Sequence, residues 1–101
     1  MRKDLEPGLQ MAQSCHCAFE FAKDYPSETN SWMSNSNYIA VLNCADEHEL
    51  LRLIEQARLN DIKFSIFREP DIENQVTSVA FEPGIKSKKL CTNLKLALKM
   101  L

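Results

Sequence analysis

The apolar residues of this sequence recur with two different periods, and that change of period limits the folds open to the chain. Three short runs rich in β-branched and aromatic residues are typical of β-strands, namely residues 38–43 (YIAVLN), 63–68 (KFSIFR) and 77–82 (TSVAFE). Two longer segments, residues 9–24 and 46–59, repeat apolar residues at helical spacing. Strands that alternate with helices predict an α/β fold, in which helices pack on the faces of a mixed β-sheet.

Turn signals set the limits of the first elements. Residues 1–5 are predicted to be the end of a first strand, and Pro7-Gly8 belongs to the turn that follows it. Tyr25-Pro26 ends the first helix, because a residue before proline is pushed away from the helical region of backbone conformation. The polar residues 26–37 predict a loop.

The remaining elements are predicted from a helix-capping residue and from polar segments that interrupt the apolar pattern. The second helix is predicted to start at Asp46, whose carboxylate caps free N–H groups of the first turn. Residues 69–76 predict a polar loop, and a last helix is predicted over residues 87–92. Residues 94–101 are predicted to be a short strand or a tail. The predicted element order is therefore β-α-β-α-β-β-α.

The composition predicts one domain, which spans residues 1–101. At 101 residues and 45% apolar composition, the chain has apolar surface for one core and no second. No apolar run approaches the roughly 20 residues needed to span a bilayer, and the first residues lack the apolar segment of a secretory signal. We therefore expect a cytoplasmic protein without a membrane partner, in which the four cysteines are reduced.

Two groups of cysteine and histidine residues raise the question of metal or thiol chemistry. Cys15-His16-Cys17 lies on a predicted helix, where residues 15 and 17 point roughly 200° apart and cannot converge on one ion. Core packing is therefore favoured, and no metal site is predicted. Cys44 and His48 have the composition of a thiol nucleophile and its base, which keeps a thiol enzyme as an alternative.

Charge is distributed unevenly along the chain. The net charge is only −2, which does not by itself indicate nucleic-acid binding. All 14 acidic residues lie before residue 85, however, whereas the segment after it contains no acid and five lysines, namely Lys86, Lys88, Lys89, Lys95 and Lys99. A basic segment on an acidic body suits contact with a phosphate backbone, and the alternative is a solvated helix face.

Three short motifs occur in a fixed order. The first, R-x-D-L followed by a Gly-containing turn and A-Q-x-x-H, covers residues 2–16. The second is the strand 63–68, which ends in arginine and is followed by an acidic loop, and the third, T-x-x-A-x-x-P, covers residues 77–83. In this order and spacing, the motifs make the chain resemble the type 2 peptidyl-tRNA hydrolases over nearly its whole length.

This resemblance implies a fold, a reaction and a partner. The family has a mixed sheet between helices, and its members hydrolyse the ester between a peptide and tRNA without a cofactor and often form homodimers. Ester hydrolysis needs a positioned water, a group that takes its proton, and donors for the oxyanion. Binding the substrate needs cationic contacts to the tRNA backbone. The expected partner is therefore tRNA, and no DNA partner is expected.

Candidate site residues are carried over from the matching positions. Glu69 aligns with the family aspartate after the third strand, and Asp71 is a second candidate for that role. The family's Gly-Lys-Gly-Lys turn is absent and its lysine position falls on Leu9, so another cation has to supply that charge. The candidate catalytic residues are Gln13, His16, Glu69, Asp71 and Thr77, and the candidate tRNA-binding residues are Arg2, Lys3, Lys86, Lys88 and Lys89.

Each candidate also has a purely structural interpretation. Gln13 occupies what is otherwise an ordinary exposed helix position, and His16 is of a type more often found satisfied in a core. The two acids after the third strand are also ordinary loop residues, and Thr77 is common in strands. The alternative function is accordingly a catalytically impaired relative that kept the fold and binds tRNA or a protein partner.

Overall fold

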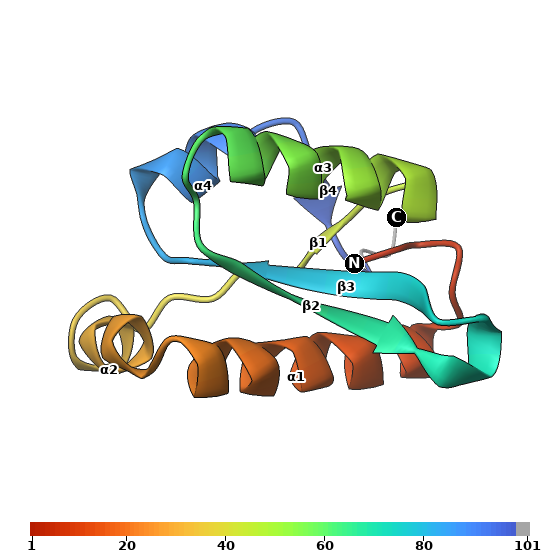
Figure 1. Cartoon of the computed structure of the whole chain (residues 1–101), viewed down its shortest axis with the longest axis horizontal. Coiled ribbons are helices and arrows are strands. Elements are labelled where there is room, and N and C mark those ends of the chain that lie inside the picture. The colour runs from red at the N-terminus through yellow and green to blue at the C-terminus, as the bar shows by residue number, and fades with distance from the viewer. Residues whose placement is uncertain (99–101) are drawn as a thin grey trace.

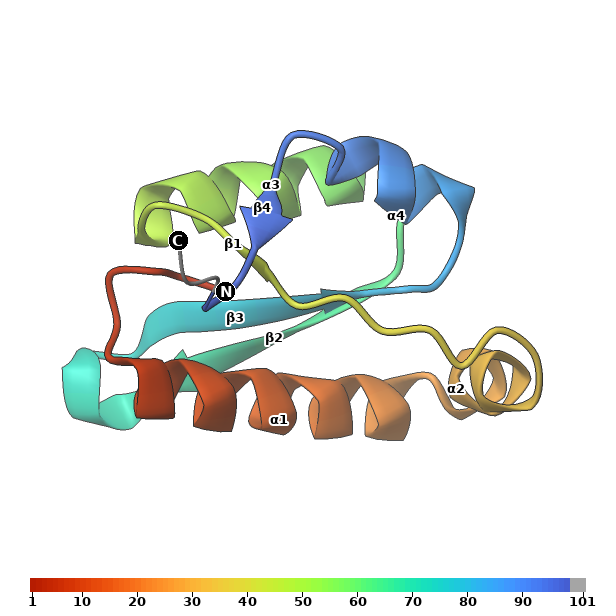
Figure 2. The ribbon, with the colours of Figure 1, turned by 180° about the vertical axis from the view of Figure 1, so that it is seen from behind.

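The computed structural model describes residues 1–98 and arranges them in three layers (Figure 1). The middle layer contains two antiparallel strands, β2 (Phe64–Glu69) and β3 (Gln75–Phe81). One long helix, α1 (Pro7–Asp24), covers one face of this pair, and α3 (Glu47–Leu59) covers the other, as the view from behind also shows (Figure 2). The predicted α/β class, with helices on the faces of a sheet, is confirmed.

The two faces of the β2–β3 pair differ in chemistry. Toward α3, the core is apolar, because Leu50 and Ile54 pack with Val76 and with half-buried side chains of both strands. Toward α1, the buried side chains that meet the helix are polar, and they include Thr77 and Ser78 of β3. Polar groups are retained in such a place only when they are hydrogen-bonded, so this second interface depends on specific contacts.

The loop predicted over residues 26–37 is wrong for most of its length. Residues Pro26–Ser34 form a helix, α2, in which Pro26 occupies the start. Proline is favoured at the first helical position, where its missing N–H removes no hydrogen bond, so it starts α2 here as well as ending α1. The Trp32 indole N–H then donates to the carbonyl of Tyr38 at 2.7 Å, and this hydrogen bond ties the segment that follows α2 back to the helix.

Two predicted strands form only in part. Of residues 38–43, only β1 (Leu42–Asn43) is a strand, and it pairs antiparallel with β4 (Lys95–Leu96). The strand predicted over residues 1–5 is reduced to one parallel bridge, between Arg2 and Cys44. A strand needs a neighbour for its N–H and C=O groups, and the apolar pattern alone does not reveal which neighbours are present.

The other boundaries shift by a few residues. Within the predicted loop 69–76, Pro70–Ile72 form a short 3-10 helix, η1, and β3 begins at Gln75. The last helix, α4, spans Ile85–Leu90. Part of the strand or tail predicted over residues 94–101 lies outside the described residues. No helix formed by residues 1–98 is both long and apolar enough to cross a membrane.

Leu50 tests the apolar core between α3 and the strands. Leu50 is 0% exposed, whereas its neighbour Leu51 is 43% exposed. We expect Leu50→Ala to lower the free energy of unfolding by about 2–5 kcal/mol, because it leaves a cavity among packed side chains. The matched change Leu51→Ala should cost less than about 1 kcal/mol. Urea denaturation measures both, and equal losses would contradict the placement of α3.

Candidate functional site

A β-bulge at Thr77 interrupts the pairing of the two central strands. Phe67 of β2 pairs with Ser78, but the next residue, Arg68, pairs with Val76, so the register shifts and Thr77 is the extra residue. A bulge of this kind breaks the alternation of side chains along a strand and re-aims the side chain of the inserted residue. The bulge therefore explains how two successive residues of β3, Thr77 and Ser78, can both direct their hydroxyl groups toward α1.

Thr77 and Ser78 both face α1 and both bind Gln13. The hydroxyl of Thr77 donates to the Gln13 side-chain oxygen Oε1 at 2.6 Å, and the hydroxyl of Ser78 donates to the Gln13 main-chain carbonyl at 2.9 Å. Val76, the residue before the bulge, packs instead in the core beneath α3. Gln13 is 2% exposed and Thr77 is 0% exposed, so these contacts are made away from solvent.

The other end of the Gln13 amide binds Glu69. Gln13 Nε2 donates to Glu69 Oε2 at 2.8 Å, and Glu69 Oε1 accepts the main-chain N–H of Asp71 at 3.2 Å. An ionised carboxylate only accepts hydrogen bonds, so the amide nitrogen has to face Glu69 and the amide oxygen has to face Thr77. Three of the predicted site residues are thus joined in one chain of contacts, Glu69–Gln13–Thr77, which we call the Gln13 cluster.

The two other candidate catalytic residues lie at the edge of the Gln13 cluster. Asp71 is exposed and joins the cluster through its main-chain N–H. His16 is exposed as well, and its ring stacks on Phe67 with centroids 4.6 Å apart and planes 6° from parallel. The interpretation of His16 as a core histidine is therefore wrong, and its ring lies one helical turn from Gln13.

Arg2 is directed into the protein. It is 6% exposed, and its Nε and Nη2 atoms donate to Asp4 at 3.0 and 2.8 Å. Its Nη1 atom donates to the side chain of Gln75 at 2.8 Å and to the carbonyl of Val76 at 3.2 Å. The hydrogen bonds that Arg2 donates to Asp4 raise the pKa of Arg2 and lower the pKa of Asp4. Because four of the five N–H groups of the guanidinium are used here, Arg2 supports β3 rather than an exposed phosphate contact.

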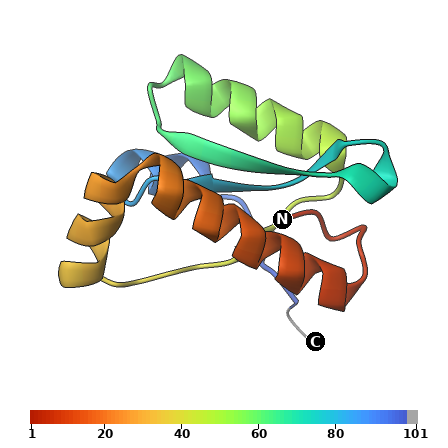
Figure 3. The same ribbon diagram turned by 60° about the horizontal axis from the view of Figure 1, so that its bottom comes forward.

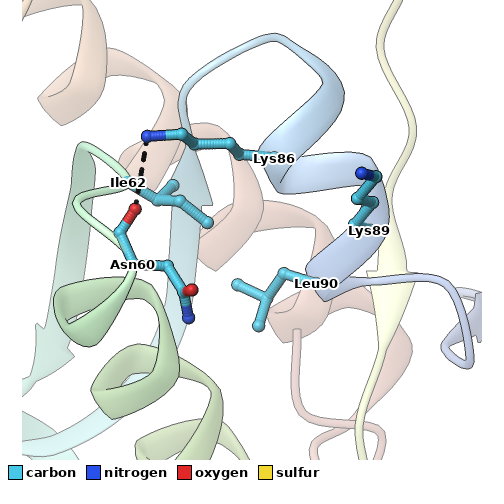
Figure 4. Close-up of a pocket in the computed structure, with 5 residues that line it drawn as sticks. All are labelled: Asn60, Ile62, Lys86, Lys89 and Leu90. Carbon is cyan, nitrogen blue, oxygen red and sulfur yellow. Dashed lines mark hydrogen bonds between the residues drawn. The ribbon is translucent and has the colours of Figure 1, made fainter.

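The candidate lysines do not join the Gln13 cluster. Lys3 is exposed, and Lys86, Lys88 and Lys89 are exposed on α4, which lies beside the end of α3 in the layer opposite α1 (Figures 1 and 2). In the close-up, Lys86 reaches toward the carbonyl of Asn60, 3.5 Å away (Figure 4). The pocket there has a volume of about 280 Å³ and is lined by Asn60, Ile62, Lys86, Lys89 and Leu90. Lys99 lies outside the described residues.

The cysteines do not form a second site. On α1, Cys15 is exposed and Cys17 is buried, so the two side chains point apart, and the core packing favoured for this group holds for Cys17 but not for Cys15. Cys44 is buried, and burial raises the pKa of its thiol, which disfavours the thiolate that a nucleophile needs. The structure therefore gives no support to a thiol enzyme at Cys44. Among residues 1–98, no group of three or more His, Cys, Asp or Glu side chains is placed to hold a metal ion.

Two contacts around the bulge were not predicted from the sequence. Ser78 holds the main chain of Gln13, and Glu47 of α3 accepts the main-chain N–H of Val76 at 2.9 Å. The two adjacent hydroxyl residues of β3 are a signal that could have pointed to Ser78. Glu47 has no comparable signal, because it lies 29 residues from its partner and looks like an ordinary acid in the first turn of a helix.

Thr77→Val tests the buried contact with Gln13. The substitution keeps the shape of the side chain but leaves Gln13 Oε1 without its donor, so we expect the free energy of unfolding to fall by about 1–3 kcal/mol. Thr92→Val is a matched control, because the Thr92 hydroxyl donates to the carbonyl of Lys88 at an exposed position. It should change stability by about 0.5 kcal/mol or less. Similar losses in both variants, measured by urea denaturation, would contradict the assigned contact.

Comparison with known proteins bears on the origin of this arrangement. No curated protein matches the sequence. Residues 1–99 match the model of the family described as Peptidyl-tRNA hydrolase PTH2. The match includes all three residues of the Gln13 cluster, and it confirms the resemblance found in the three motifs. The chain belongs to the peptidyl-tRNA hydrolase PTH2 family.

Proposed function

We propose that this chain hydrolyses the ester that joins a peptide to tRNA, and that the Gln13 cluster is its reaction site. One observation carries the proposal. The cluster joins, through hydrogen bonds of 2.6 and 2.8 Å, three residues from distant segments that match the family motifs. These residues come from a helix, from the end of β2 and from a bulge in β3. Their convergence supports a shared role, because each alone would be an ordinary helix, loop or strand residue.

Glu69 is the proposed proton acceptor. The oxygen of a water molecule bonds to the ester carbonyl carbon while one water proton passes to the Glu69 carboxylate. The bond between that carbon and the ribose oxygen then breaks, and the proton returns to the ribose oxygen as it leaves. Gln13 Nε2 donates to Glu69 Oε2 at 2.8 Å and so holds this carboxylate in place for the proton transfer.

Paired substitutions of the two acids test this assignment. We expect Glu69→Gln to lower kcat for peptide release from peptidyl-tRNA by about 100-fold or more, because the general base is removed. Asp71→Asn removes an exposed carboxylate two residues away and should lower kcat less than about tenfold, since that side chain is only a neighbour of the cluster. Single-turnover and steady-state release of a labelled peptide provide the measurement.

The same assay separates two ways in which the assignment can fail. No release by the unaltered chain would remove the proposed hydrolase activity. Release that is more sensitive to Asp71→Asn than to Glu69→Gln would instead move the role of base to Asp71. A folded state shown by an unchanged urea midpoint is the control for both variants.

A second candidate function is the binding of tRNA without cleavage. It is favoured by the position of α4, whose three exposed lysines follow the end of β3 that pairs with the start of β2, whereas Glu69 is at the other end of β2. Lysines placed there contact a phosphate backbone without taking part in the reaction. On this proposal, the lysines of α4, together with the exposed Lys3, supply affinity for tRNA, and Arg2 supplies none.

Charge reversal on α4 tests the contact with RNA. We expect the triple variant Lys86→Glu, Lys88→Glu and Lys89→Glu to weaken tRNA binding and to lower the slope of log affinity against log salt by about 3, one for each lost phosphate contact. Lys23→Glu, at an exposed lysine near the end of α1, should leave both unchanged. An unaltered affinity in the triple variant would exclude α4 from the interface. Loss of binding by a chain that releases no peptide would favour the second candidate.

Location and assembly stay predictions. We propose a cytoplasmic location, because that is where peptidyl-tRNA is produced by translation. The resemblance also predicts a homodimer. Sedimentation of the purified chain decides the second point.

A further inference from the structure

Val76, the residue just before the bulge, has both of its main-chain groups bound by charged side chains. Its N–H donates to Glu47 Oε2 at 2.9 Å, and its carbonyl accepts from Arg2 Nη1 at 3.2 Å. Val76 is 0% exposed, so solvent offers neither group an alternative partner. The edge of β3 is thus completed at this residue by two side chains in place of a neighbouring strand.

Each of the two charged residues is itself held in position. Glu47 is the first residue of α3, directly after the N-cap Asp46. Arg2 is fixed by its two hydrogen bonds to Asp4 and by a third to Gln75. Figure 3 shows that the N-terminal residues and the start of α3 gather at the same end of the molecule as the β2–β3 turn. We call the pair formed by Arg2 and Glu47 the Val76 clamp.

We infer that the Val76 clamp positions the proposed reaction site. A strand paired only on one side can slip by one residue, and such a slip sends every side chain to the opposite face. The bulge at Thr77 is one residue of slip already inserted between β2 and β3. By binding both main-chain groups of Val76, the clamp keeps the bulge at Thr77 and so keeps the Thr77 hydroxyl directed at Gln13. Through Gln13 it also sets the position of Glu69.

This inference gives Arg2 and Glu47 a role in the proposed hydrolysis, and it rests on that proposed function for its effect on rate. Neither residue needs to touch the substrate. The expected signature of a positioning residue is a loss in kcat with little change in KM, because substrate binding is retained while the reacting groups are misplaced. The effect on the geometry of the Gln13 cluster is expected whether or not the chain is an active hydrolase.

Three variants of the first turn of α3 test the clamp. Glu47→Ala should lower kcat for peptide release by about 10- to 100-fold with KM within about twofold, and it should shift the NMR signals of the Gln13 side-chain amide. Glu47→Gln keeps an oxygen that accepts the Val76 N–H, so it should restore kcat to within about threefold of the unaltered chain. Glu49→Ala removes the same charge from the same helical turn and should change neither readout.

Two readouts keep failure of the inference apart from failure of the proposed activity. If Glu47→Ala leaves the Gln13 amide signals and the exchange rate of the Val76 N–H unchanged, the clamp is overturned, whatever the activity. If the unaltered chain releases no peptide while Glu47→Ala shifts those signals, the clamp stands and the hydrolase proposal falls. Should Glu47→Ala not fold, Glu47→Asp replaces it, because it keeps the charge but is too short to reach Val76.

Discussion

The side-chain amide of Gln13 is the interaction on which this structure depends. It is buried between α1 and β3, donates to Glu69 and accepts from Thr77. Removing one partner of a buried amide destabilises the folded state, because the group left without a partner cannot bind water instead. The contact is therefore favourable only when the helix, the end of β2 and the bulge of β3 are all in place, and it couples three segments that lie far apart in the sequence.

The fold supports this arrangement by giving the two faces of the central strands different tasks. Toward α3, Val76 packs with Leu50 and Ile54 and anchors β3 through apolar contacts. Toward α1, the next residue in the chain, Thr77, carries a hydroxyl into the polar interface. The bulge makes this possible, because it allows Thr77 and Ser78 to face the same helix in succession. The apolar core and the proposed reaction site thus lie on opposite faces of one strand.

The sequence predicts the long-range outline better than the contacts within it. The periodic apolar residues predict α1, α3, β2 and β3, and the Asp46 cap is observed, with the carboxylate accepting the N–H of Glu49 at 3.0 Å. Helix α2 is missed because Pro26 signals both the end of one helix and the start of another. Gln13, Glu69 and Thr77 are identified only through the family resemblance. Glu47 is not identified at all, because no local pattern marks a carboxylate that caps a distant strand.

A double-mutant cycle between Gln13 and Thr77 tests the central claim most directly. The free energy of unfolding is measured by urea denaturation for the unaltered chain, Gln13→Ala, Thr77→Val and the double variant. If the buried amide couples the helix to the bulge, the sum of the stability losses of the two single variants should exceed the stability loss of the double variant by about 0.5–3 kcal/mol. Losses that add within about 0.3 kcal/mol would show two independent sites and would contradict the account.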